Sequence, residues 1–181
     1  MNLNEYKVLE IMNKSRKPVF FRELCKKASV SIGGTQQVLK DYSNFIDKKA
    51  EGRNTYYSLK ENLETLYLKR IIEIKKVQVF IGKNPRFKEF FDYFVKNNID
   101  CLVFGSYAKG MFSKISDIDI LALSLKNILE HLCPVRVHAV SLTKSQFESA
   151  LKKSETLINE ISYNHIIING VDYFTNMLGR K

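Results

Sequence analysis

The sequence predicts an α+β protein, with a helix-rich domain over residues 1–60 and alternating strands and helices over residues 85–181. In the first region, apolar residues at mostly helical spacing precede two β-like runs that a glycine-containing loop joins. In the second, short apolar runs typical of buried strands alternate with helical patterns. A long amphipathic pattern over residues 61–84 predicts a helix that connects the two domains.

The composition is that of a globular protein. Of the 181 residues, 45% are hydrophobic, and no apolar run approaches the roughly 20 residues that a membrane span needs. The first residues form an amphipathic pattern, whereas a signal peptide needs an apolar core. Cys25, Cys101 and Cys133 lie outside any C-x-x-C, which indicates neither a disulfide framework nor a zinc site. We therefore expect buried thiols, a cytoplasmic location and no membrane partner.

The charge is strongly basic and unevenly distributed. The formal net charge is +10, and residues 1–60 hold 12 Lys or Arg against 6 Asp or Glu, which gives +6. Residues 61–100 and 101–181 contribute +2 each. A basic module is the electrostatic footprint of a polyanionic partner such as nucleic acid, although the same charge also serves general solubility.

The helix-rich region contains three helical patterns followed by two β-like runs. The helices are predicted at Leu3–Asn13, Phe20–Ala28 and Thr35–Tyr42. Ser31, in a turn over residues 30–34, is a candidate N-cap for the third helix. The β-like runs are Phe45–Lys49 and Thr55–Leu59, with residues 50–54 as the hairpin loop. This order of elements resembles a winged helix-turn-helix domain.

The winged-helix resemblance implies that the third helix lies in the major groove of double-stranded DNA. With its apolar residues facing the core, the polar positions left for base contacts are Gln36, Gln37 and Lys40. The hairpin would contact phosphates in a salt-dependent, sequence-neutral way through Lys48, Lys49 and Arg53. A winged helix used only for dimerisation, or for holding a protein, is the alternative.

The connecting helix is predicted over Glu61–Ile81. Its apolar residues recur at intervals of mostly three and four, at Leu63, Leu66, Tyr67, Ile71, Ile74, Val77 and Phe80. The polar side carries Lys69, Arg70, Lys75 and Lys76. The apolar stripe is compatible with a homodimer seam and equally with packing against its own chain. A further helix over residues 86–98 is expected to bury its aromatic residues, Phe87, Phe90, Phe91 and Phe94.

The segment with the clearest chemistry runs from a short apolar strand, Cys101–Phe104, to a second strand over Asp117–Leu123. Between them lie Gly105-Ser106, a short helical turn at residues 107–110 and a loop over residues 111–116. Asp117 and Asp119 point the same way because strand residues alternate faces. Neighbouring carboxylates repel each other unless a cation lies between them, and Mg²⁺ takes one or two carboxylates together with substrate phosphates.

This segment resembles the minimal nucleotidyltransferases of the DNA polymerase β superfamily, in which Gly-Ser after one strand is followed by Asp-x-Asp on the next. The matching residues are Gly105, Ser106, Gly110, Ser116, Asp117 and Asp119. The resemblance implies a small parallel or mixed three-stranded core with flanking helices, nucleotide binding by the Gly and Ser positions, and Mg²⁺ or Mn²⁺ on the two catalytic aspartates. It also implies nucleotidyl transfer from a nucleoside triphosphate to a hydroxyl, and a helical toxin-type protein partner.

The remaining elements complete the second domain. Helices are predicted at residues 124–132, at residues 144–152 with Thr143 as N-cap, and at residues 155–163. A third strand is predicted over Val135–Leu142. Asn169-Gly170 favours a hairpin turn between β-like runs at residues 165–168 and 171–174.

The third strand departs from the family pattern, in which it carries a further carboxylate that completes the metal site. Residues 135–142 contain no Asp or Glu, and Arg136 and His138 share one face. His138 is a candidate base or a structural residue. The acidic residues that the fold would have to bring close as substitutes are Glu130, Glu148, Glu155 and Asp172. Two functions therefore stay open: a nucleotidyltransferase brought to DNA, or a DNA-binding regulator whose second domain senses nucleotide or dimerises.

Overall fold

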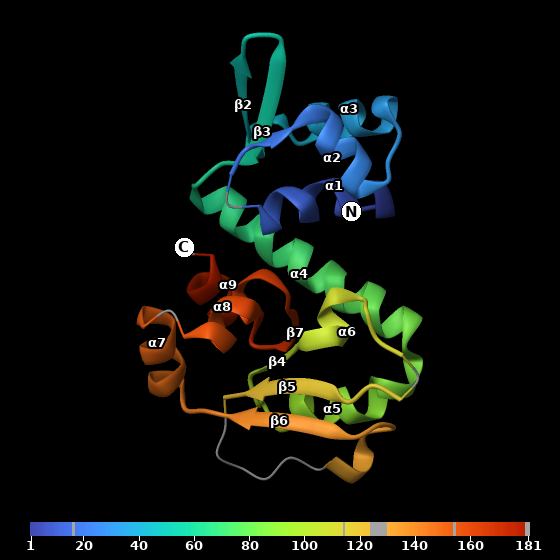
Figure 1. The fold of residues 1–181 in the computed structure, drawn as a ribbon, viewed down its shortest axis with the longest axis vertical. Coiled ribbons are helices and arrows are strands. Elements are labelled where there is room, and N and C mark those ends of the chain that lie inside the picture. Colours follow the sequence, from blue (N-terminus) through green and yellow to red (C-terminus); the bar gives the residue numbers. More distant parts are fainter. Residues whose placement is uncertain (16, 114, 124–129, 154, 180–181) are drawn as a thin grey trace. The chain divides into compact units, whose positions relative to one another are not determined.

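The computed structural model describes residues 1–15, 17–113, 115–123, 130–153 and 155–179. The chain divides into two compact units, Met1–Lys75 and Lys76–Arg180, which we call unit 1 and unit 2. The division falls inside the long helix α4, Leu63–Lys83 (Figure 1). Among the described residues, none of the helices combines the length and the apolar character needed to cross a membrane.

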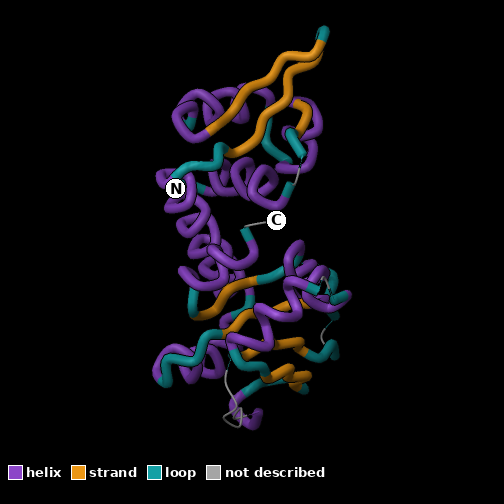
Figure 2. The backbone as a smooth tube through the Cα atoms, turned by 90° about the vertical axis from the view of Figure 1, so that its left-hand side faces the viewer, coloured by secondary structure: helices purple, strands orange, loops and turns teal. Residues whose placement is uncertain are grey.

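Unit 1 combines three helices with a small antiparallel sheet ahead of α4. Its elements are α1 Leu3–Lys14, β1 Val19–Phe20, α2 Phe21–Ala28, α3 Ile32–Asp41, η1 Ser43–Phe45, β2 Ile46–Glu51 and β3 Asn54–Leu59. The strand order is β1-β3-β2, with both pairings antiparallel. Figure 2 shows β2 and β3 as a hairpin that extends away from the helices.

The local sequence explains where the helices of unit 1 begin and what they bury. In α1, the side chain of Asn2 accepts from the N–H of Glu5 while the Glu5 carboxylate accepts from the N–H of Asn2, which is a capping box. Each helix places its apolar residues at helical spacing toward one core. Val8, Leu9 and Leu24 are completely buried, and Val38 of α3 is buried as well.

Three boundaries in unit 1 differ from the predictions. Helix α3 begins at Ile32 and not at Thr35, because Ser31 accepts a hydrogen bond from the N–H of Gly34 and the two glycines are taken into the first turn. The short strand β1 was missed: Phe20 pairs with Tyr56 of β3 and precedes α2 instead of beginning it. The hairpin loop is also shorter than predicted, since Glu51 pairs with Asn54.

Helix α4 presents two apolar stripes where the sequence predicted one. Leu63, Tyr67, Ile71 and Ile74 are between 44% and 64% exposed, whereas Leu68 and Ile72 are buried. With about 3.6 residues per turn, these two sets lie on different sides of the helix, roughly a third of a turn apart. Lys76, predicted to lie on the polar side, is buried as well. Apolar periodicity alone did not identify the buried side, because both sides of α4 satisfy it.

Unit 2 is built on a mixed four-stranded sheet. Its strands are β4 Cys101–Phe104, β5 Ile118–Ala122, β6 Val137–Ser141 and β7 Ile166–Asn169, in the order β6-β5-β4-β7. β5 and β6 are parallel, and the other two pairings are antiparallel. The flanking elements are η2 Pro85–Phe87, α5 Lys88–Lys96, α6 Gly105–Lys109, η3 Glu130–Leu132, α7 Lys144–Lys152, α8 Thr156–Tyr163 and α9 Val171–Leu178. The predicted α+β class with a small mixed sheet is confirmed for this unit, with one strand more than the three-stranded core.

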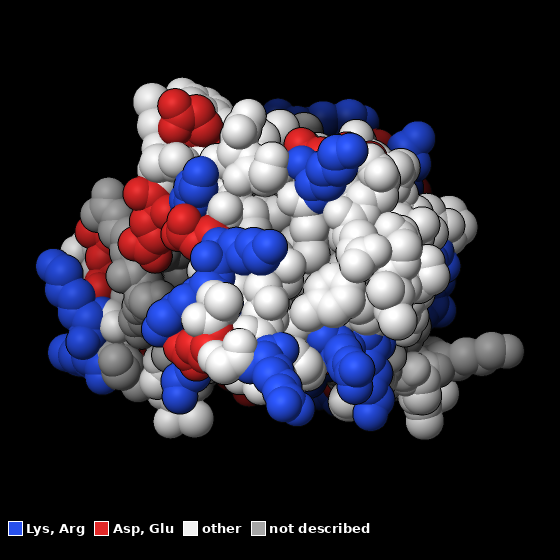
Figure 3. Space-filling view, turned by 90° about the horizontal axis from the view of Figure 1, so that it is seen from above, with Lys and Arg blue, Asp and Glu red and all other residues white. Residues whose placement is uncertain are grey.

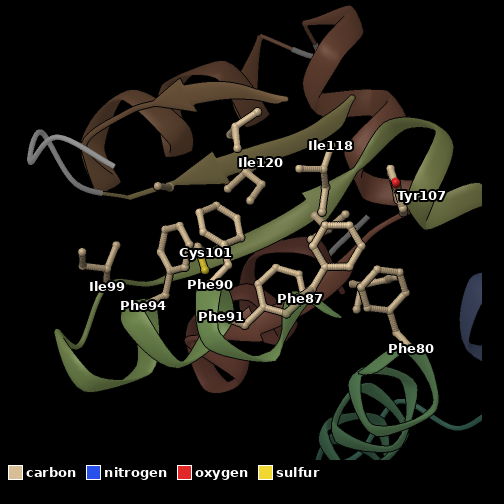
Figure 4. Close-up of a cluster of buried hydrophobic side chains, with 14 residues drawn as sticks. Phe80, Phe87, Phe90, Phe91, Phe94, Ile99, Cys101, Tyr107, Ile118 and Ile120 are labelled. Carbon is tan, nitrogen blue, oxygen red and sulfur yellow. The ribbon is translucent and has the colours of Figure 1, made fainter. Parts of the chain in front are cut away.

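Alternate residues of the strands feed two separate apolar cores, one on each face of the sheet. Cys101 of β4 packs with the aromatic side chains of η2 and α5, as Figure 4 shows. Val103 belongs to the same core. Leu102 and Phe104 face the other way, toward apolar residues of α7, α8 and α9. The four phenylalanines predicted to be core are buried, at Phe87, Phe90, Phe91 and Phe94.

Two of the three cysteines are buried as predicted, and the third is only half-buried. Cys25 and Cys101 are buried, as predicted, and burial raises the pKa of the Cys101 thiol well above its ordinary value. Cys133 is only half-buried, and burial is the main reason that its pKa is raised. None of the three forms a disulfide.

Two predictions for the second half of the chain need correction, and one of them lies partly outside the described residues. The Asn169-Gly170 hairpin is wrong: β7 is a strand, but Val171–Leu178 is helix α9, because Phe174 and Leu178 pack at helical spacing into the core. Gly170, at φ +82°, begins that helix. Of the helix predicted over residues 124–132, residues 124–129 lie outside the described residues, and 130–132 form a 3₁₀ turn.

Candidate functional site

The glycine after β4 and the second aspartate of the D-x-D motif are in direct contact. β4 and β5 pair so that Phe104 lies opposite Asp119, and Gly105 follows with φ at +66°. A Cβ atom at Gly105 would overlap Asp119 Oδ2 and lie 2.8 Å from its Cγ. Position 105 therefore requires glycine for two reasons: its backbone conformation disfavours a side chain, and the Asp119 carboxylate occupies the space that a side chain would need.

The rest of the Gly-Ser segment forms the short helix α6. It begins at Gly105, two residues before the predicted helical turn, and Ser106 is half-buried in its first turn. Gly110 ends the helix in the left-handed conformation, and its N–H group reaches the carbonyls of Ser106 and Tyr107. Ser106 thus lies next to the Gly105–Asp119 contact, while Gly110 shapes the turn behind it.

The loop before β5 is held by its own serines. Ser116 Oγ accepts from the N–H of Ser113 at 2.9 Å, and the two hydroxyl groups lie 3.1 Å apart. The Tyr107 hydroxyl lies 3.4 Å from the carbonyl oxygen of Ser116. These contacts give Ser116 a local role in closing the loop that delivers Asp117 to the sheet edge.

The two aspartates differ in their surroundings. β5 begins at Ile118 and not at Asp117, so Asp117 is exposed immediately before the strand. The Asp119 side chain is 25% exposed and lies within the strand. Ile118 and Ile120 are buried in the core on the opposite face, which agrees with the predicted alternation. If that alternation extends one residue beyond β5, both carboxylates are on the same side of the sheet.

The neighbouring strand brings an imidazole to Asp119. β6 runs parallel to β5, and His138 is the register partner of Asp119. His138 Nδ1 lies 3.2 Å from Asp119 Oδ1, and the histidine side chain is 72% exposed. From the sequence alone, His138 was a single histidine on a predicted strand, with no indicated partner. Its proximity to Asp119 depends on the parallel register, which has no local sequence signal.

The two aspartates suit a divalent cation that receives most of its other ligands from substrate phosphates and water. Among the described residues there is no group of three or more His, Cys, Asp or Glu side chains placed to hold a metal ion. The acidic residues considered as substitutes therefore do not complete a site with Asp119; Glu148, for example, accepts a hydrogen bond from the Tyr173 hydroxyl. Mg²⁺ is typically held by one or two carboxylates plus phosphates, and Asp117 and Asp119 match that pattern.

In unit 1, the residues predicted to bind DNA are all exposed: Gln36, Gln37, Lys40, Lys48, Lys49 and Arg53. Two of them have neighbours within the unit. Gln37 Nε2 donates to Asp41 Oδ1 at 2.7 Å, and Lys49 Nζ lies 2.7 Å from Glu51 Oε1. The Glu51 carboxylate raises the pKa of Lys49 and offsets its charge locally. Lys49 is therefore the less available of the hairpin cations for a phosphate.

A pocket links α3 to the β2–β3 hairpin. It has a volume of about 270 Å³ and is lined by Phe20, Phe21, Arg22, Gln36, Arg53, Thr55 and Tyr57. It brings Gln36 and Arg53, predicted separately, to one place and adds Arg22, which no sequence pattern indicated. In the view from above (Figure 3), Lys and Arg side chains alternate with neutral and acidic surface, so the basic charge does not form one continuous patch there.

Comparison with known families supports the interpretation of unit 2. Residues 85–164 match the family model described as a nucleotidyltransferase domain. The matched segment contains Gly105, Ser106, Asp117, Asp119 and His138. Nucleotidyltransferase domains in general transfer nucleotidyl groups from nucleoside triphosphates and use divalent metal ions. No match was found among curated proteins or among solved structures.

Proposed function

We propose that unit 2 binds a divalent cation with a nucleoside triphosphate and transfers the nucleotidyl group to a hydroxyl acceptor. The observation that carries the proposal is the contact between Gly105 and Asp119 inside the segment that matches the nucleotidyltransferase domain. An isolated D-x-D pair is a weak signal. The contact joins it to the Gly-Ser turn, so the two halves of the motif form one site.

Each residue of the site has a distinct role in this proposal. The missing side chain of Gly105 leaves room for the Asp119 carboxylate, and Ser106 offers a hydroxyl donor to a phosphate oxygen. Asp117 and Asp119 hold the cation, which supplies charge neutralisation for the triphosphate and for the leaving pyrophosphate. In the transfer, the acceptor oxygen bonds to the α-phosphorus, the bond from that phosphorus to the β-phosphate oxygen breaks, and the hydroxyl proton passes to water.

A second candidate function is a regulator that binds nucleotide without transferring it. β6 has His138 opposite Asp119 and contains no carboxylate. The group that would complete the metal site and help activate the acceptor is thus absent from this strand. This observation favours nucleotide sensing over catalysis, while leaving the nucleotide site itself unchanged.

We also propose that unit 1 is a winged helix-turn-helix domain that binds duplex DNA. The element order α1-β1-α2-α3-β2-β3 and the antiparallel sheet support the proposal. The exposed polar residues of α3 and the shared pocket with Arg53 support a DNA-facing surface. The proposed contacts are Gln36, Gln37 and Lys40 with bases, and Lys48 and Arg53, with a smaller part for Lys49, with phosphates.

The homodimer and the helical toxin-type partner remain predictions. The exposed apolar residues of α4, Leu63, Tyr67, Ile71 and Ile74, offer a surface for the former.

The nucleotide site is tested by calorimetric titration of the four nucleoside triphosphates with and without Mg²⁺. We expect Mg²⁺-dependent binding that Asp117→Asn or Asp119→Asn weakens at least tenfold, on the order of what a lost metal-site group costs. Asp47→Asn removes an exposed carboxylate in β2 and is the matched control, which should bind like the wild type. Unchanged binding in both site variants would refute the assignment.

A transfer assay separates the two candidate functions. The protein is incubated with a nucleoside triphosphate labelled at the α-phosphate, Mg²⁺, and either itself, RNA or DNA as acceptor. Label that becomes attached to an acceptor in the wild type, and not in Asp119→Asn, supports the transferase. Tight nucleotide binding together with no transfer to any acceptor supports the regulator.

A further inference from the structure

The pair formed by Asp119 and His138 is more specific than the D-x-D motif alone. The two residues are register partners on adjacent parallel strands, and Nδ1 of the imidazole faces Oδ1 of the carboxylate at 3.2 Å. On the other side, Asp119 is confined by Gly105. The histidine is 72% exposed, so solvent and ligands reach its ring. The Asp119 side chain is 25% exposed, so a small ion from solvent can also reach the carboxylate.

The separation of the two atoms suits two kinds of interaction. It allows a hydrogen bond between the imidazole and the carboxylate. It also matches two adjacent ligands of one octahedral ion, because bonds of about 2.1 Å at right angles place neighbouring donors about 3.0 Å apart. Small adjustments of the two side chains would then be sufficient for both atoms to bind the same cation.

We propose that His138 Nδ1 is a ligand of the divalent cation together with Asp119, and that the site prefers transition-metal ions over Mg²⁺. The proposal rests on the proposed nucleotide site and names its metal chemistry. Mg²⁺ prefers oxygen ligands, whereas first-row transition ions accept imidazole nitrogen readily. An imidazole in place of a carboxylate on β6 therefore changes which cation fits, while preserving the number of ligands that the strand supplies.

The same substitution changes the charge of the site. An imidazole that binds a metal ion through a ring nitrogen adds no negative charge, whereas a carboxylate in its place would add one. A site with fewer negative charges and a nitrogen ligand favours a softer cation over Mg²⁺, because Mg²⁺ is strongly hydrated and gives up its water reluctantly.

The test uses the full chain with Mn²⁺ alone and then with Mn²⁺ and ATP. Electron paramagnetic resonance measures bound Mn²⁺, Mg²⁺ competition gives the relative affinity, and pulsed measurements detect a directly bound imidazole nitrogen. We expect the wild type to bind Mn²⁺ at least tenfold more tightly than Mg²⁺ and to show nitrogen coupling. His138→Ala should lose the coupling and bind Mn²⁺ about 10–100-fold more weakly. His138→Asp should lose the coupling and shift the preference toward Mg²⁺.

Two further variants separate ligation from positioning. His131→Ala removes an exposed histidine of η3 and should keep the nitrogen coupling. His138→Asn retains a side-chain donor for Asp119 but provides a poor metal ligand. If His138→Asn binds Mn²⁺ like the wild type, or if the wild type binds Mn²⁺ without nitrogen coupling, His138 only positions Asp119 and the proposal is overturned.

The result also distinguishes this proposal from the proposed function. Loss of cation binding in Asp119→Asn with no effect of His138 variants would overturn the histidine assignment alone. Absence of any cation binding by the wild type, with ATP or without it, would overturn the nucleotide site as well. Because His138 is mostly exposed, unfolding by its replacement is not expected, and a thermal denaturation curve for each variant checks this.

Discussion

The two units of this protein present functional side chains in contrasting ways. In unit 1 the candidate groups are long side chains on the surface, such as Lys40, Lys48 and Arg53. In unit 2 they are short side chains in mutual contact, where Gly105, Asp119 and His138 come from three different elements. Phosphate attraction acts over several ångströms and tolerates flexible side chains, whereas a metal site requires its ligands within a few tenths of an ångström. Small changes should therefore be far more damaging in unit 2.

The largest effect is expected from Gly105→Ala. The new Cβ overlaps the Asp119 carboxylate, and the backbone at φ +66° disfavours a side chain. We expect the free energy of unfolding to fall by about 1–3 kcal/mol and Mg²⁺-dependent nucleotide binding to be lost. Urea unfolding and calorimetry measure the two effects.

Gly82→Ala is the matched control for that substitution. Gly82 lies in α4, and its Cβ would meet no atom within 4 Å. Alanine is the better helix former, so this variant should gain up to about 1 kcal/mol and bind nucleotide normally. If Gly105→Ala behaves like Gly82→Ala, the contact with Asp119 does not constrain the site.

An intermediate effect is expected from charge removal in unit 1. The Lys40→Ala/Arg53→Ala double variant should weaken binding to a DNA duplex of mixed sequence. The slope of log K against log salt concentration should become shallower by about 1, since Arg53 is the phosphate contact that is lost and each such contact contributes about 0.9. Fluorescence anisotropy at several salt concentrations measures both quantities.

Lys49→Ala tests whether the salt dependence of DNA binding reflects only the number of cations in the hairpin or also which of them contacts DNA. Because Lys49 is 2.7 Å from Glu51, its removal should change the slope by less than the removal of Arg53. Equal slopes for the two single variants would mean that DNA displaces Glu51 from Lys49. An unchanged slope in the double variant would show that DNA does not contact these residues.

The smallest effect is expected from removing a helix cap. The same kind of cap occurs in both units. Asn2 begins α1 and Thr143 begins α7, each with a complete capping box. Replacing either with Ala should cost about 1 kcal/mol. Hydrogen exchange should show reduced protection mainly in unit 1 for Asn2→Ala and mainly in unit 2 for Thr143→Ala. Equal loss of protection in both units would mean that they unfold together.

Local sequence signals predicted most of the elements. The strand Cys101–Phe104 and the helix Lys144–Lys152 have the predicted bounds, because a short apolar run and a capping residue are unambiguous there. The predictions were wrong where one sequence pattern is compatible with two different structures. Asn169-Gly170 favours a hairpin, yet the packing of Phe174 and Leu178 favours a helix. In α4 the apolar period fits both sides, and only packing selects one of them.

The sequence by itself determined the composition of the candidate site: a Gly-Ser turn, a D-x-D pair and a third strand that contains His138 and no carboxylate. These are local facts, set by which residues follow one another. Only the tertiary structure decided that Gly105 touches Asp119 and that His138 faces it from the other strand. Strand order and register depend on how two apolar faces are buried on either side of one sheet, and that is a property of the whole unit.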